Sequence, residues 1–317
     1  MQRVEYVPAA VHVQVGSKGV ITGKPPWSLK PHSGKLERMI LQLGSGRGRF
    51  SEVTGIPRSI GCIGNNEYIL RREPLSIGDF KRIILDFEKL GGKELWITNY
   101  DRVEVLLTLA NFAVDVGIPE VYAVVLFEDL ASIRPIEGVK FVVEISYPEV
   151  RSYHLEGFEW IHGVLAMVHP DYLDDLMNEP FPGEVYADVL FPGSAKRMTI
   201  NTIELRRILN PTTEKYHDCL AGMIAVTAEG YVLPCPILRN YVVGDVKKEG
   251  LKKIVRRKRL RTFWRMTKDK IPSCSSCPFR YICHDCRALE YQATGEIDGV
   301  EYCPIFLSSL QNSRIDL

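Results

Sequence analysis

The chain has 317 residues, 45% of them hydrophobic and 25% charged, which is ordinary for a globular protein with one large domain and a smaller one. Its formal net charge of +1 excludes a general attraction to polyanions, so such a partner would need a local basic cluster. No apolar run approaches the ~18 residues that cross a bilayer, and residues 1–19 lack the features of a secretory signal, so we expect a cytoplasmic protein without a membrane partner.

Residues 1–38 are expected to form a lead-in to the main domain. Residues 11–15 and 19–22 predict a hairpin that turns near Ser17–Gly19. The prolines that follow, Pro25, Pro26 and Pro31, indicate irregular chain.

From residue 39 to about 209, short apolar segments alternate with helical patterns. One predicted helix starts at Ser76, a candidate N-cap with Asp79 three residues on, and another spans 103–116 and ends at Gly117. The predicted strands are 39–43, 94–98, 121–126, 139–145, 164–168 and 185–191. Six such units in a row require parallel strands with crossover connections, which defines an α/β fold. An open sheet and a partial (β/α)6 barrel both fit, and in either the reactive face lies at the carboxyl ends of the strands.

The cysteines mark a change in composition. Seven of the eight lie after residue 218, so we place a boundary near Pro211, between a domain at 39–212 and a cysteine-rich domain at 213–317. A hairpin is expected within the second domain, formed by 223–226 and 231–233 and turned at Glu229–Gly230.

The spacing of these cysteines predicts a metal site. The ligand candidates are Cys219, Cys235, Cys274, Cys277, Cys283, Cys286 and Cys303. Cys274 and Cys277 form one C-x2-C pair, and Cys283 and Cys286 form a second pair five residues later. Intracellular thiols stay reduced, so such clustering favours metal binding over disulfides or buried structural cysteine. Zinc is the main competitor to iron–sulfur clusters, and His217 and His284 are candidate partners in mixed zinc sites.

The pattern Cys219-x10-Gly230-x4-Cys235, followed by Gly244-Asp245-Val246 and the C-x2-C-x5-C run, resembles the SPASM domain. That domain follows the partial barrel of many radical S-adenosylmethionine (radical SAM) enzymes that modify peptides, and it holds two auxiliary [4Fe–4S] clusters. The resemblance implies that Cys274, Cys277, Cys283 and Cys303 hold one cluster. It implies that Cys219, Cys235 and Cys286 hold the other, with the fourth ligand unassigned. The sequence departs from the family in having two residues, not three, between Cys283 and Cys286.

The main domain lacks the motifs by which radical SAM enzymes bind AdoMet. Their C-x3-C-x2-C spacing falls here on Arg47, Ser51 and Thr54, and starting from Cys62 it falls on Asn66 and Ile69. The Gly-Gly-Glu turn of the family is replaced by residues 99–101, Asn-Tyr-Asp. We therefore predict a degenerate radical SAM barrel in which AdoMet binding is not expected.

Two further features of the main domain have modest interpretations. Arg47 and Arg49 indicate either a cationic loop for an anion or an ordinary solvated loop. Cys62 is interpreted as a small buried apolar residue, so Cys62→Ala should leave the metal content unchanged.

Residues 247–270 are strongly basic, with Phe263 and Trp264 interleaved. One interpretation is nucleic-acid binding by phosphate neutralisation and base stacking. The other is an amphipathic helix with Leu251, Ile254, Val255, Leu260 and Phe263 facing inward. An acidic peptide or protein partner is also compatible with this segment.

Three functional hypotheses remain at this point. The leading one is an iron–sulfur protein that has lost the AdoMet cluster and acts in electron transfer, or as a scaffold or partner in peptide or protein modification. The second is a zinc-stabilised module that binds peptide or nucleic acid. The third is an enzyme with other chemistry at Arg47, Arg49 or Asp101, although the sequence offers no nucleophile and no catalytic residue that we can nominate.

Overall fold

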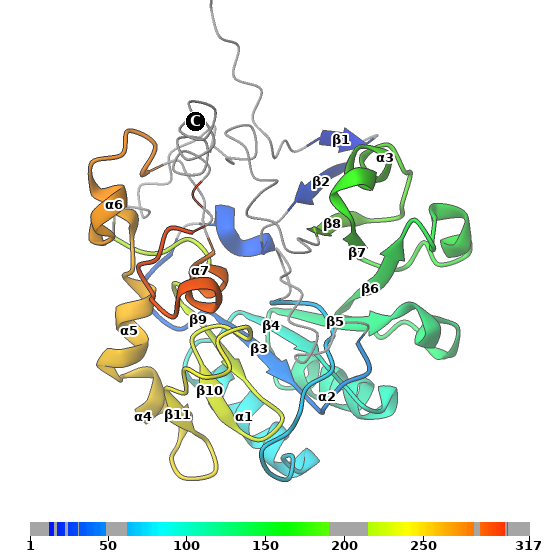
Figure 1. Cartoon of the computed structure of the whole chain (residues 1–317). Coiled ribbons are helices and arrows are strands. Elements are labelled where there is room, and N and C mark those ends of the chain that lie inside the picture. The colour runs from blue at the N-terminus through cyan, green and yellow to red at the C-terminus, as the bar shows by residue number, and fades with distance from the viewer. Residues whose placement is uncertain are drawn as a thin grey trace, which may run out of the picture.

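The structure is a computed structural model, and it describes residues 13–15, 18–22, 25–30, 32–48, 62–189, 215–281, 286–301 and 303. One sheet of eleven strands organises these residues and curves into an open arc (Figure 1). The strands are β1 (Val13–Val15), β2 (Lys18–Thr22), β3 (Arg38–Gln42), β4 (Glu94–Thr98), β5 (Glu120–Leu126), β6 (Val139–Tyr147), β7 (Gly163–Val168), β8 (Glu184–Val189), β9 (Met223–Val226), β10 (Tyr231–Leu233) and β11 (Gly244–Asp245). Their order across the sheet is β1-β2-β8-β7-β6-β5-β4-β3-β9-β10-β11.

The six central strands, β3 to β8, run parallel in sequence order, which confirms the predicted α/β fold. These segments could be predicted as strands because a parallel sheet is covered on both faces, so its strands consist of continuous apolar residues. Every residue of β3, β4 and β7 is buried accordingly. The two predicted hairpins are also present within the described residues, as the antiparallel pairs β1–β2 and β9–β10.

Two amphipathic helices pack against the outer face of the sheet. They are α1 (Ile77–Lys89) and α2 (Val103–Asp115). The capping box predicted for α1 is present, because the Ser76 hydroxyl accepts the Asp79 N–H while the Asp79 carboxylate accepts the Ser76 N–H. The helices that connect the later strands are shorter than α1 and α2. They are η2 (Phe127–Ser132), η3 (Ser152–Leu155), η4 (Pro170–Tyr172) and α3 (Leu173–Met177).

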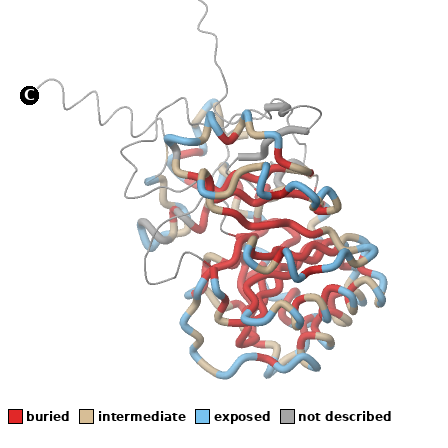
Figure 2. Tube along the Cα trace, turned by 90° about the vertical axis from the view of Figure 1, so that its right-hand side faces the viewer, coloured by how far each residue is buried: buried red, intermediate tan, exposed pale blue. Residues whose placement is uncertain are grey.

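The inner face of the curved sheet is packed with aromatic side chains. Trp96 stacks on Tyr122, with ring centroids 4.0 Å apart, and meets Tyr186 edge to face at 6.4 Å. Trp27, on the short helix η1 (Pro26–Leu29), closes over Trp96 at 5.9 Å. Figure 2 shows the resulting buried band through the middle of the molecule. The interior is therefore a core rather than a channel.

The cysteine-rich region continues the same sheet. β9 pairs in parallel with β3, so β9, β10 and β11 extend the edge of the main sheet. The predicted boundary near Pro211 lies within residues 190–214, outside the described residues. The described helices of this region are α4 (Leu251–Val255), α5 (Lys258–Trp264), η7 (Lys268–Lys270), α6 (Pro272–Ser275) and α7 (Arg287–Thr294). Among all described helices, none combines the length and apolar character needed to cross a membrane.

The basic segment forms two short helices rather than one amphipathic helix. Arg257 is extended, with φ −64° and ψ 132°, and its guanidinium donates to the Val243 carbonyl at 2.7 Å. This anchor breaks the helix between α4 and α5. The five predicted inward residues are nevertheless all buried: Leu251, Ile254, Val255, Leu260 and Phe263.

Candidate metal centre and the strand ends beside it

A seven-residue segment, 62–68, lies across the carboxyl ends of the central strands, and we refer to it as the mouth segment. Asn65 is its centre. The Asn65 side-chain oxygen accepts the Asn99 N–H at 2.7 Å and the Thr98 hydroxyl at 3.2 Å, at the end of β4. The Asn65 amide group donates to the Val124 carbonyl of β5 at 3.3 Å and to the Glu144 carboxylate of β6 at 3.2 Å. One asparagine thus joins three neighbouring strand ends.

Asn66 and Asn99 close the remaining space against β3. The Asn99 side chain accepts the Asn66 N–H at 2.6 Å and donates to the Gly44 carbonyl at 2.9 Å. Gly46 has φ +81°, and a Cβ built there would overlap the Asn66 carbonyl oxygen. A Cβ at Gly48 would overlap the Asn65 carbonyl in the same way. The chain after β3 therefore needs glycine, because the mouth segment lies directly against it.

The charged side chains at this mouth are matched internally. Asp101 accepts hydrogen bonds from the Ser45 hydroxyl at 2.8 Å and the Gly46 N–H at 2.7 Å. Arg47 forms an ion pair with Asp129 and lies 5.3 Å from the centroid of the Tyr100 ring. Arg49 lies outside the described residues. Arg47 and Asp101 thus have structural contacts at the position where the sequence allowed a reactive pair.

Three of the predicted ligands lie around the inner core. Trp27 donates its indole N–H to the Cys219 carbonyl at 2.9 Å. Cys235 follows β10, is buried, and belongs to the same apolar cluster as Trp27 and Trp96. Cys286 is the N-cap residue of α7 and packs against this cluster. The structure thus brings together the three cysteines that the resemblance assigned to one cluster.

A fourth thiol, Cys62, lies in the same place. Cys62 is the first described residue of the mouth segment, and it is buried in the apolar cluster that contains Cys235. Burial raises the pKa of the Cys62 thiol well above its ordinary value, and the nearby Cys235, Cys219 and Cys286 raise it further. Burial, with the neighbouring Cys286, raises the pKa of Cys235 to about 12. Cys62 has no motif spacing to the C-terminal cysteine-rich region, residues 219–303, which we call the tail. Sequence reasoning therefore missed this grouping.

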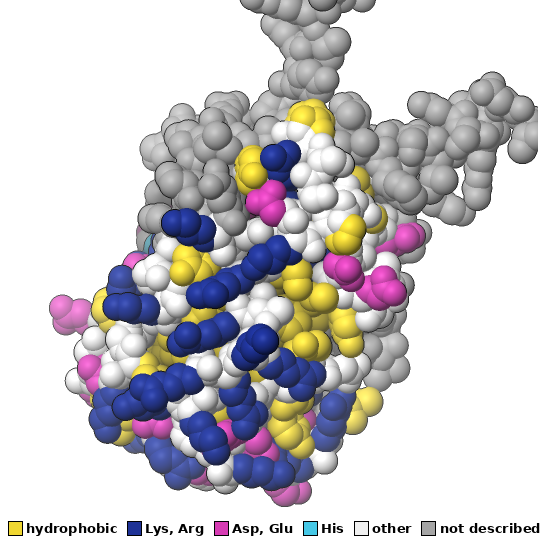
Figure 3. All heavy atoms as spheres, turned by 90° about the vertical axis from the view of Figure 1, so that its left-hand side faces the viewer, with side chains coloured by type: hydrophobic (Ala, Val, Ile, Leu, Met, Phe, Trp, Pro, Cys, Tyr) yellow, Lys and Arg dark blue, Asp and Glu magenta, His cyan; other side chains and the backbone are white. Residues whose placement is uncertain are grey.

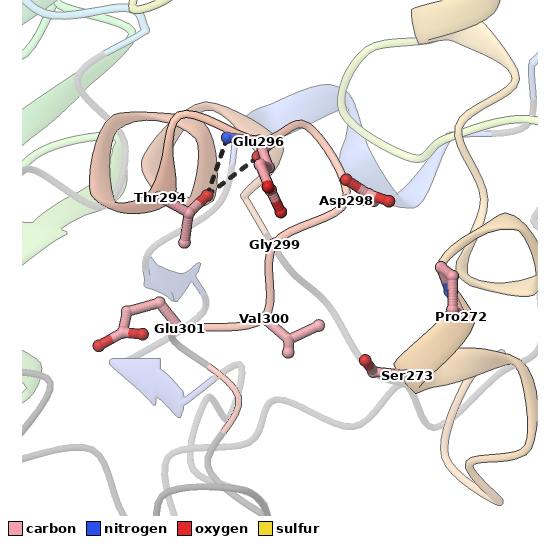
Figure 4. Close-up of a pocket in the computed structure, with 8 residues that line it drawn as sticks. All are labelled: Pro272, Ser273, Thr294, Glu296, Asp298, Gly299, Val300 and Glu301. Carbon is pink, nitrogen blue, oxygen red and sulfur yellow. Dashed lines mark hydrogen bonds between the residues drawn. The ribbon is translucent and has the colours of Figure 1, made fainter.

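Three of the remaining cysteines, Cys274, Cys277 and Cys303, lie on or near the last two described helices, α6 and α7, along the chain. Cys274 is buried on α6, and Cys277 follows with its N–H donating to the Cys274 carbonyl at 2.9 Å. Cys303 is half-buried and follows α7 in the chain, and Cys283 lies outside the described residues. A cavity of about 320 Å³ separates α6 from the segment after α7 (Figure 4). Its lining residues are Pro272, Ser273, Thr294, Glu296, Asp298, Gly299, Val300 and Glu301.

His217 fits a supporting role better than a ligand role. His217 is buried, and its Nδ1 accepts the N–H groups of Cys219 and Leu220 at 3.1 and 3.2 Å, which orients the turn that carries Cys219. His284 lies outside the described residues. Among the described residues, no group of three or more His, Cys, Asp or Glu side chains is placed to hold a single metal ion. A [4Fe–4S] cluster makes a different demand, since each of its four irons takes one thiolate, and four thiols around one core fit that donor set.

Arginine side chains fix the elements that carry these cysteines. Arg72, just beyond the mouth segment, pairs with Asp245 of β11 at 2.8 Å and donates to the Glu229 carbonyl at the β9–β10 turn. Arg287 of α7 is buried and donates to the carbonyls of Ile297 and Gly299, at 3.1 and 2.8 Å. Arg72 thereby ties the chain after the mouth segment to the β9–β10 turn and β11, and Arg287 ties α7 to the loop that follows it.

Comparison with known proteins identifies the family of the C-terminal cysteine-rich region. Residues 219–278 match the SPASM family, described as an iron–sulfur cluster-binding domain, and this stretch contains Cys219, Cys235, Cys274 and Cys277. No curated protein matches the sequence. One similar solved structure is BtrN in an open conformation, with 14% identity and a TM-score of 0.36 over 77% of this chain and 92% of that chain. Another is Streptococcus suis SuiB bound to S-adenosylmethionine, with 14% identity and a TM-score of 0.44 over 81% of this chain and 72% of that chain. The chain therefore contains a SPASM region, which binds iron–sulfur clusters.

Proposed function

We propose that the protein is a radical SAM-like iron–sulfur protein that keeps its tail clusters and has no AdoMet cluster of its own. In this role it passes electrons to a partner, or serves as a scaffold for it, during peptide or protein modification. The tail thiols would hold one or two [4Fe–4S] clusters, which supply one-electron redox chemistry when bound.

One observation carries this proposal: the tail thiols gather around the inner core while the strand ends are filled by the chain itself. Asn65 and Asn66 occupy the space above β3 to β6, where an α/β protein of this kind would bind a cofactor. Arg47 and Asp101, the charged side chains that sequence nominated there, are already engaged by Asp129 and by Ser45 and Gly46 respectively.

Anaerobic purification followed by assays of iron, acid-labile sulfide, zinc and the visible spectrum tests this proposal. We expect a brown protein with iron and sulfide in equal amounts, and no cleavage of AdoMet after reduction with dithionite. A colourless protein with stoichiometric zinc would support the zinc-stabilised module instead. AdoMet cleavage by the reduced protein would refute the loss of the AdoMet cluster.

For the partner, we propose an acidic segment of a peptide or protein. The basic face consists of Lys252, Lys253, Arg256, Lys258, Arg261 and Arg265, all exposed on α4, α5 and their flanks. Figure 3 shows Lys and Arg side chains spread over this side of the molecule. Phe263 and Trp264, which base stacking would need, are instead buried, and the Trp264 indole donates to the Met223 carbonyl at 2.9 Å. Charge without accessible rings favours an acidic chain over a single-stranded nucleic acid.

Binding of fluorescent poly-glutamate and of a single-stranded RNA oligonucleotide at low salt tests the partner class. Arg256→Glu with Arg261→Glu should weaken poly-glutamate binding about tenfold, as two surface charge contacts of ~0.7 kcal/mol each would give. Arg102→Glu with Arg134→Glu makes the same change in net charge at exposed positions just before α2 and after η2, and should have little effect. RNA binding that exceeds poly-glutamate binding, or equal losses in the two double variants, would refute the proposal.

A further inference from the structure

We propose that Cys62 is the fourth thiolate ligand of the iron–sulfur cluster held by Cys219, Cys235 and Cys286. This inference rests on the proposed function, because it assumes that a cluster is bound by the tail. It assigns a metal-binding role to the chain after β3, which lies outside the C-terminal cysteine-rich region.

Three separate parts of the chain converge to form this group of thiols. Cys62 comes from the mouth segment, Cys235 from the end of the β9–β10 hairpin, and Cys286 from the start of α7. Cys62 and Cys235 are 8% and 4% exposed within one apolar cluster, and Cys286 packs against it. The indole of Trp27, a member of that cluster, holds the backbone of Cys219.

The count of thiols agrees with this assignment. A [4Fe–4S] cluster takes four thiolates, and the chain contains eight cysteines. The resemblance to the SPASM domain assigns Cys274, Cys277, Cys283 and Cys303 to one cluster, which leaves Cys219, Cys235 and Cys286 one ligand short of a second. Cys62 is the remaining cysteine, and it lies beside these three.

The side chains of the group are chemically suited to one cluster. Each would bond to iron as a thiolate, and the positive charge of the iron would offset the repulsion that four bare anions would suffer beside an apolar core. A lone buried cysteine is well explained as a small apolar residue, but that explanation does not account for Cys62 and Cys235 buried in one cluster with Cys286 packed against it and Cys219 hydrogen-bonded to its Trp27.

The assignment reverses the expectation drawn from sequence, in which Cys62→Ala leaves the metal content unchanged. The region after β3 is where a radical SAM enzyme would hold its AdoMet cluster. In this chain the same region would donate its one thiol to the tail and thereby tie the mouth segment to the C-terminal region.

Iron and sulfide content, together with the EPR spectrum of the dithionite-reduced protein, tests the assignment on the full chain. Cys62→Ala should lose about half of the bound iron and one of two EPR signals, as Cys219→Ala should. Ile63→Val is the matched control, because it shortens the adjacent buried side chain of the same cluster and should keep both signals. Circular dichroism establishes that each variant is folded.

Cys62→Ser provides a second measurement if the alanine variant fails to fold. Serine preserves the size of the side chain and offers only an oxygen ligand, so the EPR signal of that cluster should shift or disappear. Unchanged iron and EPR in Cys62→Ala or Cys62→Ser would overturn the assignment and leave the proposed function intact, as would an equal loss in Ile63→Val. Iron-free wild-type protein would instead refute the proposed function.

Discussion

Replacement of Asn65 by alanine is the most direct test of the mouth segment, and we expect it to lower the free energy of unfolding by about 2–6 kcal/mol. The variant loses four buried hydrogen bonds, of which the bond from the Asn99 N–H, at 2.7 Å, is the shortest. That N–H would be left without its acceptor in space that excludes water, which costs ~1–3 kcal/mol. The bonds to Val124 and Glu144 add ~0.5–1.5 kcal/mol each, while the Thr98 hydroxyl can rotate to another acceptor.

Urea unfolding monitored by tryptophan fluorescence measures this loss, because Trp27 and Trp96 are buried in the inner core below the mouth segment. Asn111→Ala is the matched control. Asn111 is exposed on α2, its side chain donates to Asp115 at 3.0 Å, and its loss should change stability by less than ~0.5 kcal/mol. Samples are compared at equal iron content. If Asn65→Ala is no less stable than Asn111→Ala, the mouth segment does not seal the strand ends.

Gly46→Ala should lower the free energy of unfolding by more than ~2 kcal/mol, because the new Cβ overlaps Asn66 and the backbone is left-handed. The control, Gly91→Ala, has φ +80° and open space around it, so it should cost only the ~1–2 kcal/mol of that backbone conformation. Equal losses for the two variants in urea unfolding would refute the overlap at Gly46. His162 and Tyr186 lower the pKa of Glu184 to about 2, so its stabilising contribution is complete above the unfolded value near 4.5 and is lost as pH falls through about 2. Unfolding free energies at several pH values should therefore decline less between these limits in Glu184→Gln than in the wild type, and identical slopes would contradict this. Cys277→Ala should lower bound iron and increase proteolysis after residue 270, because ligation energy is folding energy; unchanged iron would remove Cys277 from the ligand set.

The sheet was predictable because its strands are buried on both faces, so each appears in the sequence as an uninterrupted apolar run. β4 matches its predicted bounds, and β3 differs by one residue at each end. The start of α1 was also predictable, because the Ser76–Asp79 capping box joins residues only three apart in the sequence. In each case the physical signal lies within a few consecutive residues.

The features that were not predicted depend on contacts between distant segments. The pairing of β9 with β3 joins residues on either side of the expected boundary, and no local pattern encodes that register. Asn65 looks like an ordinary loop residue until β4, β5 and β6 surround it. Cys62 likewise appears isolated, because it meets its partners only after the hairpin and α7 have packed onto the inner core. The break between α4 and α5 is caused by a contact between Arg257 and Val243 that helical periodicity cannot show.

The mouth segment links the two halves of the proposed function. Cys62 at its start belongs to the inner core beside the tail thiols, and Asn65, three residues later, fastens it over the strand ends. A metal bound at Cys62 would hold the start of this segment, three residues from Asn65, so ligation and closure of the strand ends would stabilise each other. The energy of ligation would then hold the chain across the position where AdoMet binding would require open space. On this view, use of Cys62 by the tail and loss of the AdoMet cluster are two consequences of one rearrangement after β3.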